Sequence, residues 1–188
     1  MPMRLSRRTA IANLATLATL ASCGLASAWA QPAPLPADLA GSGLAVRGQQ
    51  RFRVWGFEVY DASLWTTPSF QPSQSETQLL ALELHYLRDF AAKDIAERSI
   101  KEMRRSAPMS AEQESRWMSE MLRVLPNVRR DDRLLGLQRP GEAAVFWHNG
   151  RLRGEVRDAE FARRFFGIWL SPQSSEPALR RALLGSAS

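Results

Sequence analysis

The chain has 188 residues, 45% of them hydrophobic, with 25 basic against 19 acidic side chains and a net charge of +6. With two histidines and one cysteine it cannot form an intrachain disulfide or a zinc site built from His and Cys ligands. The basic residues are not gathered into a stripe, so we expect no nucleic-acid partner.

The first thirty residues have the order of an export signal. Three arginines come first, an uncharged stretch follows, and a small-residue cleavage site stands at Ala28 and Ala30. The apolar stretch is too short to act as a permanent membrane anchor. Residues 1–30 are therefore predicted to be a signal peptide, and the mature protein to be periplasmic or secreted. Cys23 lies in a lipobox-like context and is a candidate lipid anchor, with cleavage at Ala30 as the alternative.

The mature chain begins with a proline-rich segment, residues 31–40. It lacks apolar periodicity, so we expect an extended lead-in outside the core. The remaining residues, 41–188, are predicted to form one domain. Because the leader removes three arginines, 22 basic and 19 acidic residues remain, and the mature net charge is +3.

The first part of the domain is predicted to be strands. Residues 52–60 and 62–66 are rich in aromatic and β-branched side chains and indicate two strands, or one strand bent near Asp61. Residues 79–87 alternate apolar and mixed positions, which predicts a strand with one buried face and one half-solvated face that carries His85.

Two helices are predicted next. Asp89 is a plausible N-cap for a helix whose apolar stripe extends to Met103 and which ends before Pro108. Ser110 and Gln113 have the spacing of a capping box and begin a second helix, which ends before Pro126.

The last part of the chain returns to strands and then to helices. Residues 133–138, 143–147 and 151–156 are predicted to be an antiparallel meander, because the Asn149-Gly150 pair favours a tight hairpin turn. Residues 158–170 and 177–184 then have helical patterns. This segregated order predicts an α+β domain with helices layered on an antiparallel sheet.

Few residues indicate catalysis. His85 and His148 are expected at solvated positions, and no histidine or thiol is predicted in an enclosed site that would activate a nucleophile. No phosphate-binding glycine loop or acidic metal loop occurs, so we expect no metal and no cofactor. Arg47 has large apolar neighbours, where a charge must be paired. It either pairs with Glu58 or presents its guanidinium to an anionic ligand.

Short motifs recur in a fixed order along the mature chain: Gly43–Arg47, Val54–Trp65, Leu84–Asp89, Asn149–Gly150, Phe166–Leu170 and Leu183–Gly185. Together they resemble chalcone isomerase-like proteins, particularly the exported bacterial branch of that family. The resemblance implies an open-faced β-sandwich, in which helices cover one face of a large antiparallel sheet and a ligand cleft lies between them.

The resemblance also implies site residues. The plant enzymes bind the phenolate and enolate of a chalcone with an arginine, a threonine, a tyrosine and an asparagine. The matching positions here hold Arg47, Trp55, Phe90 and Glu97, and Tyr60 stands at the strand end. Only the arginine is retained, and losing three oxyanion donors should abolish isomerase chemistry. These five residues form the predicted ligand-binding site.

The resemblance favours a non-catalytic function. Related non-enzymatic members bind fatty acids in the same cleft, so we expect an exported binder of a small amphipathic or anionic ligand. Arg47 would bind the anionic group, and aromatic walls would supply most of the affinity. One alternative is an intramolecular lyase or isomerase acting on a chalcone-like substrate, with Arg47 and Tyr60 stabilising the charge. The other is a structural interaction module without a ligand.

Overall fold

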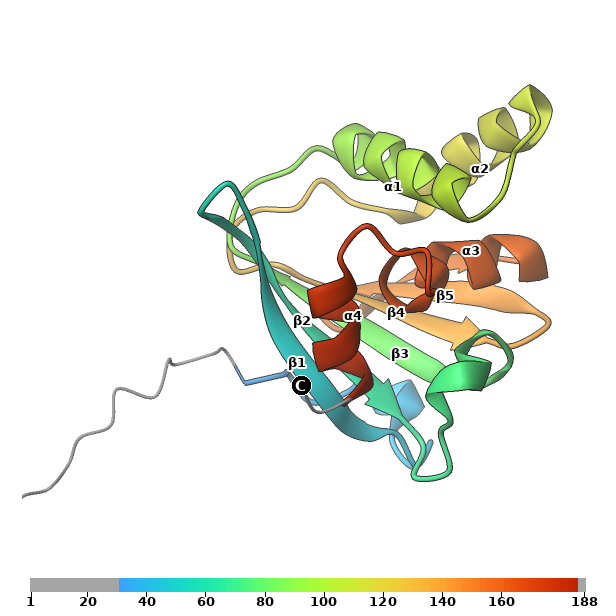
Figure 1. Ribbon diagram of the computed structural model, residues 1–188. Helices are drawn as coiled ribbons and strands as arrows, with labels where there is room; N and C mark the ends of the chain where they lie inside the picture. The colour runs from blue at the N-terminus through green and yellow to red at the C-terminus, as the bar shows by residue number, and fades with distance from the viewer. Residues whose placement is uncertain (1–30, 186–188) are drawn as a thin grey trace, which may run out of the picture.

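One antiparallel sheet organises residues 31–185, the part of the chain that the computed structural model describes (Figure 1). Its spatial strand order is the chain order, from β1 to β6. The strands are β1 Ala45–Val54, β2 Phe57–Thr66, β3 Leu80–Tyr86, β4 Arg133–Arg139, β5 Ala143–His148 and β6 Arg151–Val156. The expected signal peptide, residues 1–30, and the candidate anchor Cys23 lie outside the described residues.

The helices are layered on one face of this sheet (Figure 1). They are α1 Ala92–Ser106, α2 Ala111–Val124, α3 Ala159–Leu170 and α4 Pro177–Leu184, with short 3-10 turns η1 Ala37–Leu39 and η2 Pro72–Thr77. The predicted α+β class with an open antiparallel sheet is confirmed. None of the helices within residues 31–185 combines the length and the apolar character needed to cross a bilayer.

The hairpin that joins β1 to β2 differs from the prediction. Val54 pairs with Phe57, so Trp55 and Gly56 alone form the turn, and both have positive φ, 49° and 84°. Asp61, where the sequence suggested a break, lies inside β2. A two-residue turn with positive φ at both positions matches the twist of a hairpin, and Gly56 accepts this conformation without steric cost.

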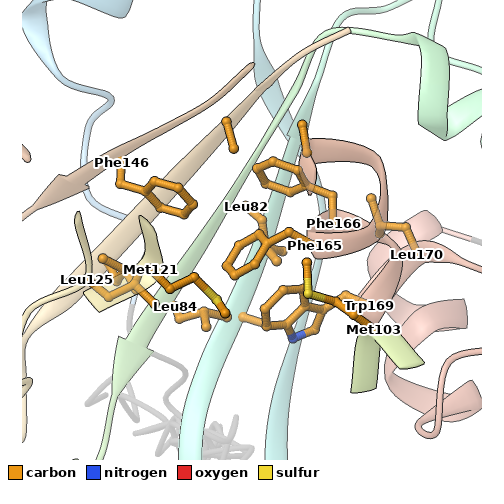
Figure 2. Packing of buried hydrophobic residues seen from close by; sticks show 14 of the residues in the cluster. Leu82, Leu84, Met103, Met121, Leu125, Phe146, Phe165, Phe166, Trp169 and Leu170 are labelled. Carbon is orange, nitrogen blue, oxygen red and sulfur yellow. The ribbon is translucent and has the colours of Figure 1, made fainter. Parts of the chain in front are cut away.

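The core lies between the sheet and the helices (Figure 2). The buried face predicted for β3 is confirmed, because Leu82 and Leu84 point into this core. The half-solvated character predicted for the opposite face is wrong, because Ala81 is fully buried and Glu83 is 5% exposed. They meet Met121 of α2 and a row of aromatic residues on α3 that includes Phe165 and Trp169. The helices therefore depend on the sheet for burial of their apolar faces.

The second face of the sheet is covered by the start of the described chain. Leu39 is buried in a small cluster with side chains of β3, β4 and β5, among them Ala81 and Trp147, and Leu35 packs against it. The prediction that residues 31–40 stay outside the core is therefore wrong in this respect. A sheet face that carries several apolar residues needs cover, and this segment provides it.

His85 lies on that second face and is not the solvated residue that the sequence suggested. Its side chain is 12% exposed, with Nδ1 3.9 Å from Asp61 Oδ2 and Nε2 3.4 Å from Asp131 Oδ1. Burial lowers the pKa of His85, and the charge of Arg133 lowers it further, although the two carboxylates act in the opposite direction. The neutral imidazole is therefore favoured in the folded protein.

The start of α1 also differs from the prediction. Asp89 does not cap this helix, because its Oδ1 accepts a hydrogen bond from the backbone N–H of Arg130 at 2.8 Å. The N–H of Ala92 donates instead to Asn127 Oδ1, also at 2.8 Å. The cap thus comes from a residue 35 positions away, beyond the reach of a local sequence pattern.

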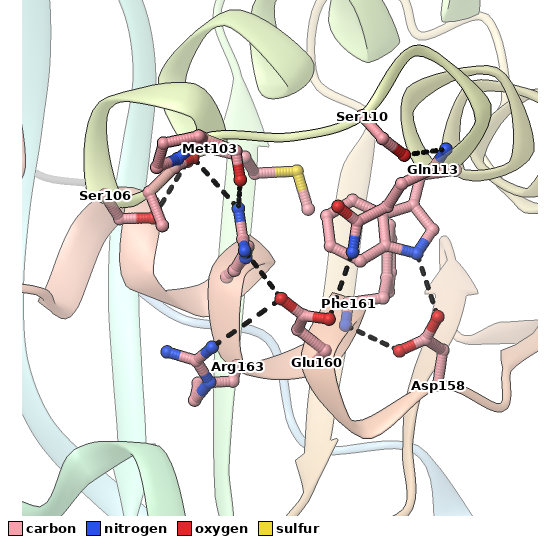
Figure 3. A network of polar contacts seen from close by, with 12 residues as sticks. Met103, Ser106, Ser110, Gln113, Asp158, Glu160, Phe161 and Arg163 are labelled. Carbon is pink, nitrogen blue, oxygen red and sulfur yellow. Dashed lines mark hydrogen bonds and ion pairs between the residues drawn. The ribbon is translucent and has the colours of Figure 1, made fainter.

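The caps of α2 and α3 agree with the sequence and join the two helices (Figure 3). Ser110 Oγ accepts from Gln113 N at 3.1 Å, and Asp158 Oδ1 accepts from Phe161 N at 2.9 Å. Asp158 Oδ2 also accepts from Trp117 Nε1 at 2.9 Å. Burial opposes the charge of this carboxylate, but the hydrogen bonds outweigh it and lower the pKa of Asp158.

Helix α4 lies directly against β1 at Gly48. A Cβ at this position would be 2.2 Å from the carbonyl oxygen of Ala182 and 2.4 Å from that of Leu183. Only glycine allows the two backbones to approach this closely. This contact fixes α4 over the outer part of the sheet.

Candidate ligand-binding cavity

A cavity of about 430 Å³ lies between the sheet and helices α1, α3 and α4. This volume is within the range of about 300–1,000 Å³ that is typical of small-molecule sites. Most of the lining is apolar: Phe52, Val54, Trp55, Phe57, Val59, Leu84, Phe90, Ile95, Leu134, Phe165, Ile168, Trp169 and Leu179. The polar lining residues are Tyr60, Tyr86, Arg88, Asp94, Arg98, Ser99, Glu102, Ser175 and Glu176.

Two phenols, one half-buried and one buried, form part of the cavity wall. Tyr60 of β2 and Tyr86 of β3 are cross-strand partners, with ring centroids 6.1 Å apart in an edge-to-face arrangement. Phe52 stacks on Tyr60 at 5.0 Å, and Phe90 packs on Tyr86 at 5.8 Å. The antiparallel register of β2 and β3 thus brings two hydroxyl groups into one apolar space.

The two hydroxyls differ in their partners. Tyr60 Oη accepts a hydrogen bond from Trp169 Nε1 at 3.0 Å, whereas the Tyr86 hydroxyl has no hydrogen-bond partner among residues 31–185. Burial raises the pKa of both phenols, although the bond from Trp169 partly opposes this at Tyr60. Both groups therefore stay protonated and can donate a hydrogen bond to a molecule in the cavity.

Charged side chains also line the cavity. Arg98 Nη2 lies 2.8 Å from Oε1 of Glu102, a largely buried carboxylate on the same helix. Asp94 and Glu176 also line this region, and Arg88 lies over the ring of Phe57 at 5.0 Å. Two guanidinium groups thus face three carboxylates, so the lining is close to neutral and not strongly cationic.

The structure places three of the five predicted site residues at the cavity. Tyr60 and Phe90 form part of its wall, and Trp55 stands at its edge on the hairpin turn. Glu97 is not part of the lining. It lies on the solvent side of α1 and pairs with Lys93, one turn earlier, at 3.7 Å.

Arg47, expected to bind an anionic ligand group, also lies outside the cavity lining. Its Nε donates to the carbonyl oxygen of Leu184 at 2.8 Å, and its guanidinium lies over the ring of Phe70 at 5.1 Å. A cation at the last carbonyls of a helix satisfies unpaired acceptors and interacts favourably with the helix dipole. Arg47 therefore holds the end of α4.

The alternative ion pair of Arg47 with Glu58 is also not present. Glu58 instead bonds the guanidinium groups of Arg51 and Arg53, at 2.9 and 2.8 Å. Arg51 in turn makes two bonds to Asp61, at 2.7 and 2.8 Å. These pairs connect β1 and β2 across the hairpin.

The sequence reasoning missed the charged pair of α1. Ile95, Ser99 and Glu102 follow one another at helical spacing, and all three line the cavity. A carboxylate on an otherwise apolar stripe was the available signal, because such a group must find a partner when it is buried. That partner is Arg98, four residues earlier on the same helix, whose side chain is 59% exposed.

A sheet covered by helices on one face, with an apolar cavity between them that is lined by a few polar groups, defines the fold as an open-faced α+β sandwich. The sequence matches the profile of the chalcone isomerase-like family over residues 34–185, and the chain belongs to that family. Among residues 31–185 no group of three or more His, Cys, Asp or Glu side chains is arranged to hold a metal ion.

One sequence relative and one solved structure illustrate the similarity. An uncharacterized protein of Haemophilus influenzae is 30% identical over 134 residues, which cover 70% of this chain and 64% of that protein. The chain thus spans less than two thirds of this relative's length. The crystal structure of the Arabidopsis thaliana fatty-acid binding protein AtFAP1 superposes with a TM-score of 0.58 at 9% identity, covering 77% of this chain and 88% of that one. At this identity the likeness concerns the fold.

Proposed function

We propose that this protein is a non-catalytic binder of a single fatty-acid-like, amphipathic molecule, held in the cavity between the sheet and the helices. The observation that carries the proposal is an apolar space of about 430 Å³ with two protonated phenols in its wall. The fatty-acid binding activity named for AtFAP1, which shares the fold, supports the same ligand class.

The apolar lining accounts for affinity toward a hydrocarbon chain. Each methylene group that leaves water contributes about 0.8 kcal/mol, so a medium-length chain supplies enough free energy for micromolar binding even after the cost of association. Phe165, Ile168 and Leu179 provide aliphatic and aromatic contacts on the helical side, and Leu84 and Leu134 provide them on the sheet.

The polar lining indicates the kind of head group. Tyr86 has an unused donor, Tyr60 a second hydroxyl, and Arg98 stands at the same end of the cavity, where its charge acts on Tyr60. A carboxyl or other hydrogen-bond acceptor fits this arrangement. Because the surrounding charges nearly cancel, we expect hydrogen bonding to contribute more to the affinity than net charge.

The same wall argues against an isomerase. Glu102, the buried carboxylate of the lining, is engaged by Arg98 and is not free to act as a base. Arg47, the residue that matches the family's anion-binding arginine, faces Leu184 instead of the cavity. Turnover of a chalcone above its spontaneous rate, lost in Tyr60→Phe, is the result that would favour the enzymatic alternative.

We also propose that the protein is exported and acts in the periplasm or outside the cell. This rests on the leader-like order of residues 1–30, with basic, apolar and small-residue parts. Fractionation of cells that express the full chain, followed by N-terminal sequencing of the mature protein, tests export and distinguishes cleavage after Ala30 from lipidation at Cys23.

A pair of matched substitutions tests the cavity. Ser99 of α1 and Ser119 of α2 each donate a hydrogen bond to the carbonyl four residues earlier, but Ser99 lines the cavity and Ser119 is exposed. Calorimetric titration of delipidated protein with dodecanoate should show binding in the wild type and in Ser119→Trp. Ser99→Trp should lower the affinity at least about tenfold, because the indole fills the space of the ligand. Equal affinity of the two variants, both folded by circular dichroism, would contradict the proposed site.

A further inference from the structure

The tip of the β1–β2 hairpin combines features that the fold itself does not require. Trp55 is 95% exposed and has a φ of 49°. A bulky residue rarely adopts positive φ, and Asn or Gly is usual at this turn position. A large exposed indole at a position that disfavours it indicates a role in contact with something outside the chain.

The indole has apolar neighbours on the same tip. Phe57 is 60% exposed and Val54 is also exposed, and all three side chains line the edge of the cavity. In Figure 1 the far end of the β1–β2 hairpin extends past the sheet toward the segment that leads into α1. The exposed tip is therefore continuous with the apolar wall of the proposed ligand site.

A cationic side chain lies against this tip. Arg88 lies over Phe57 at 5.0 Å, is exposed, and forms no ion pair with a carboxylate within residues 31–185. The backbone N–H of Arg130 donates to Asp89, the residue after Arg88, and the Arg130 side chain is also exposed. Aromatic side chains with adjacent arginines match the two layers of a membrane surface, the acyl boundary and the anionic head groups.

We propose that the hairpin tip, Val54–Phe57, docks on the surface of an anionic phospholipid bilayer, so that the edge of the cavity faces the membrane. Docking is independent of the proposed function. Only the further idea that the cavity exchanges its ligand with the bilayer rests on the proposed function. A protein partner is less well suited, since a stable interface buries about 800 Å² on each side and a two-residue turn offers far less.

Sedimentation with vesicles of equimolar phosphatidylglycerol and phosphatidylethanolamine tests the proposal on delipidated protein. Trp55→Asn creates an Asn-Gly turn suited to the local φ, so this variant should keep its thermal stability while vesicle binding falls about tenfold or more. Leu152→Asn removes an exposed apolar side chain, 61% exposed, on β6 and away from the cavity, and should leave vesicle binding unchanged.

Three results would overturn the docking proposal. The simplest is failure of the wild-type protein to sediment with these vesicles. Equal binding by Trp55→Asn is the second. The third is self-association of the wild-type protein that Trp55→Asn abolishes, with no vesicle binding by either protein. This result would assign the tip to contact with a second copy. Titration with dodecanoate is measured separately, so a failure of docking is distinguishable from a failure of ligand binding.

Discussion

Replacing Tyr86 by phenylalanine tests whether this hydroxyl serves a ligand or the fold. Tyr86 is buried between Tyr60 and Phe90, and its hydroxyl has no hydrogen-bond partner among residues 31–185. The substitution removes an unpaired polar group and keeps the ring. The free energy of unfolding of the ligand-free protein should therefore stay unchanged or rise by up to about 1 kcal/mol.

The same substitution should weaken ligand binding, although it does not lower stability. A hydrogen bond to a charged group contributes about 1.5–3 kcal/mol, so loss of the Tyr86 donor should weaken binding of dodecanoate roughly 10- to 150-fold. Tyr60→Phe is the matched control, because it leaves the N–H of Trp169, 3.0 Å from the Tyr60 hydroxyl, without its acceptor. This variant should lose about 1–3 kcal/mol of stability.

Thermal and urea unfolding of delipidated protein, together with calorimetric titration, measure both quantities. A Tyr86→Phe protein that is clearly destabilised, or that binds dodecanoate as tightly as the wild type, would refute the assignment of this hydroxyl to the ligand.

Three further predictions concern other parts of the structure. Arg98→Gln should weaken dodecanoate binding several-fold. Arg47→Gln should lower the free energy of unfolding by about 1–2 kcal/mol, because the contact at the end of α4 is lost, and should leave the dissociation constant unchanged. Calorimetric titration measures the first effect and melting curves measure the second. Gly48→Ala should cost about 1–3 kcal/mol in urea unfolding, while Gly167→Ala, whose added Cβ meets its nearest neighbour at 3.6 Å inside α3, should be neutral or stabilising. Because the pKa of His85 is lower in the folded protein than in the unfolded chain, its contribution to stability is present above about pH 6.5 and is lost as the pH falls below that value. His85→Asn should reduce this pH dependence of the unfolding free energy. An unchanged pH profile in the variant would contradict this role of His85.

The elements that follow local rules could be predicted from the sequence. The alternation of Leu80, Leu82 and Leu84 indicates both the strand and its buried face, because the side-chain period of a strand is two. Ser110 and Asp158 cap the helices that follow them, as their types and positions indicate. Such signals depend only on residues a few positions apart.

The features that sequence reasoning missed depend on distant contacts. Arg47 has apolar neighbours in either interpretation, but its partner carbonyl at Leu184 is 137 residues away, so the pattern does not tell a helix cap from a ligand anchor. The role of Arg98 depends likewise on the burial of Glu102 in the cavity lining. At the hairpin, Gly56 inside a strand-like run was the available signal for a turn.

Native mass spectrometry of the full chain, expressed and purified without delipidation, tests the central claim most directly. The account predicts a co-purified amphipathic molecule at one copy per chain in the wild type and in Ser119→Trp, and its loss in Ser99→Trp. A wild-type protein that carries no such molecule and does not take up dodecanoate, or a Ser99→Trp variant that retains the molecule, would contradict the assignment of the cavity as a ligand-binding site.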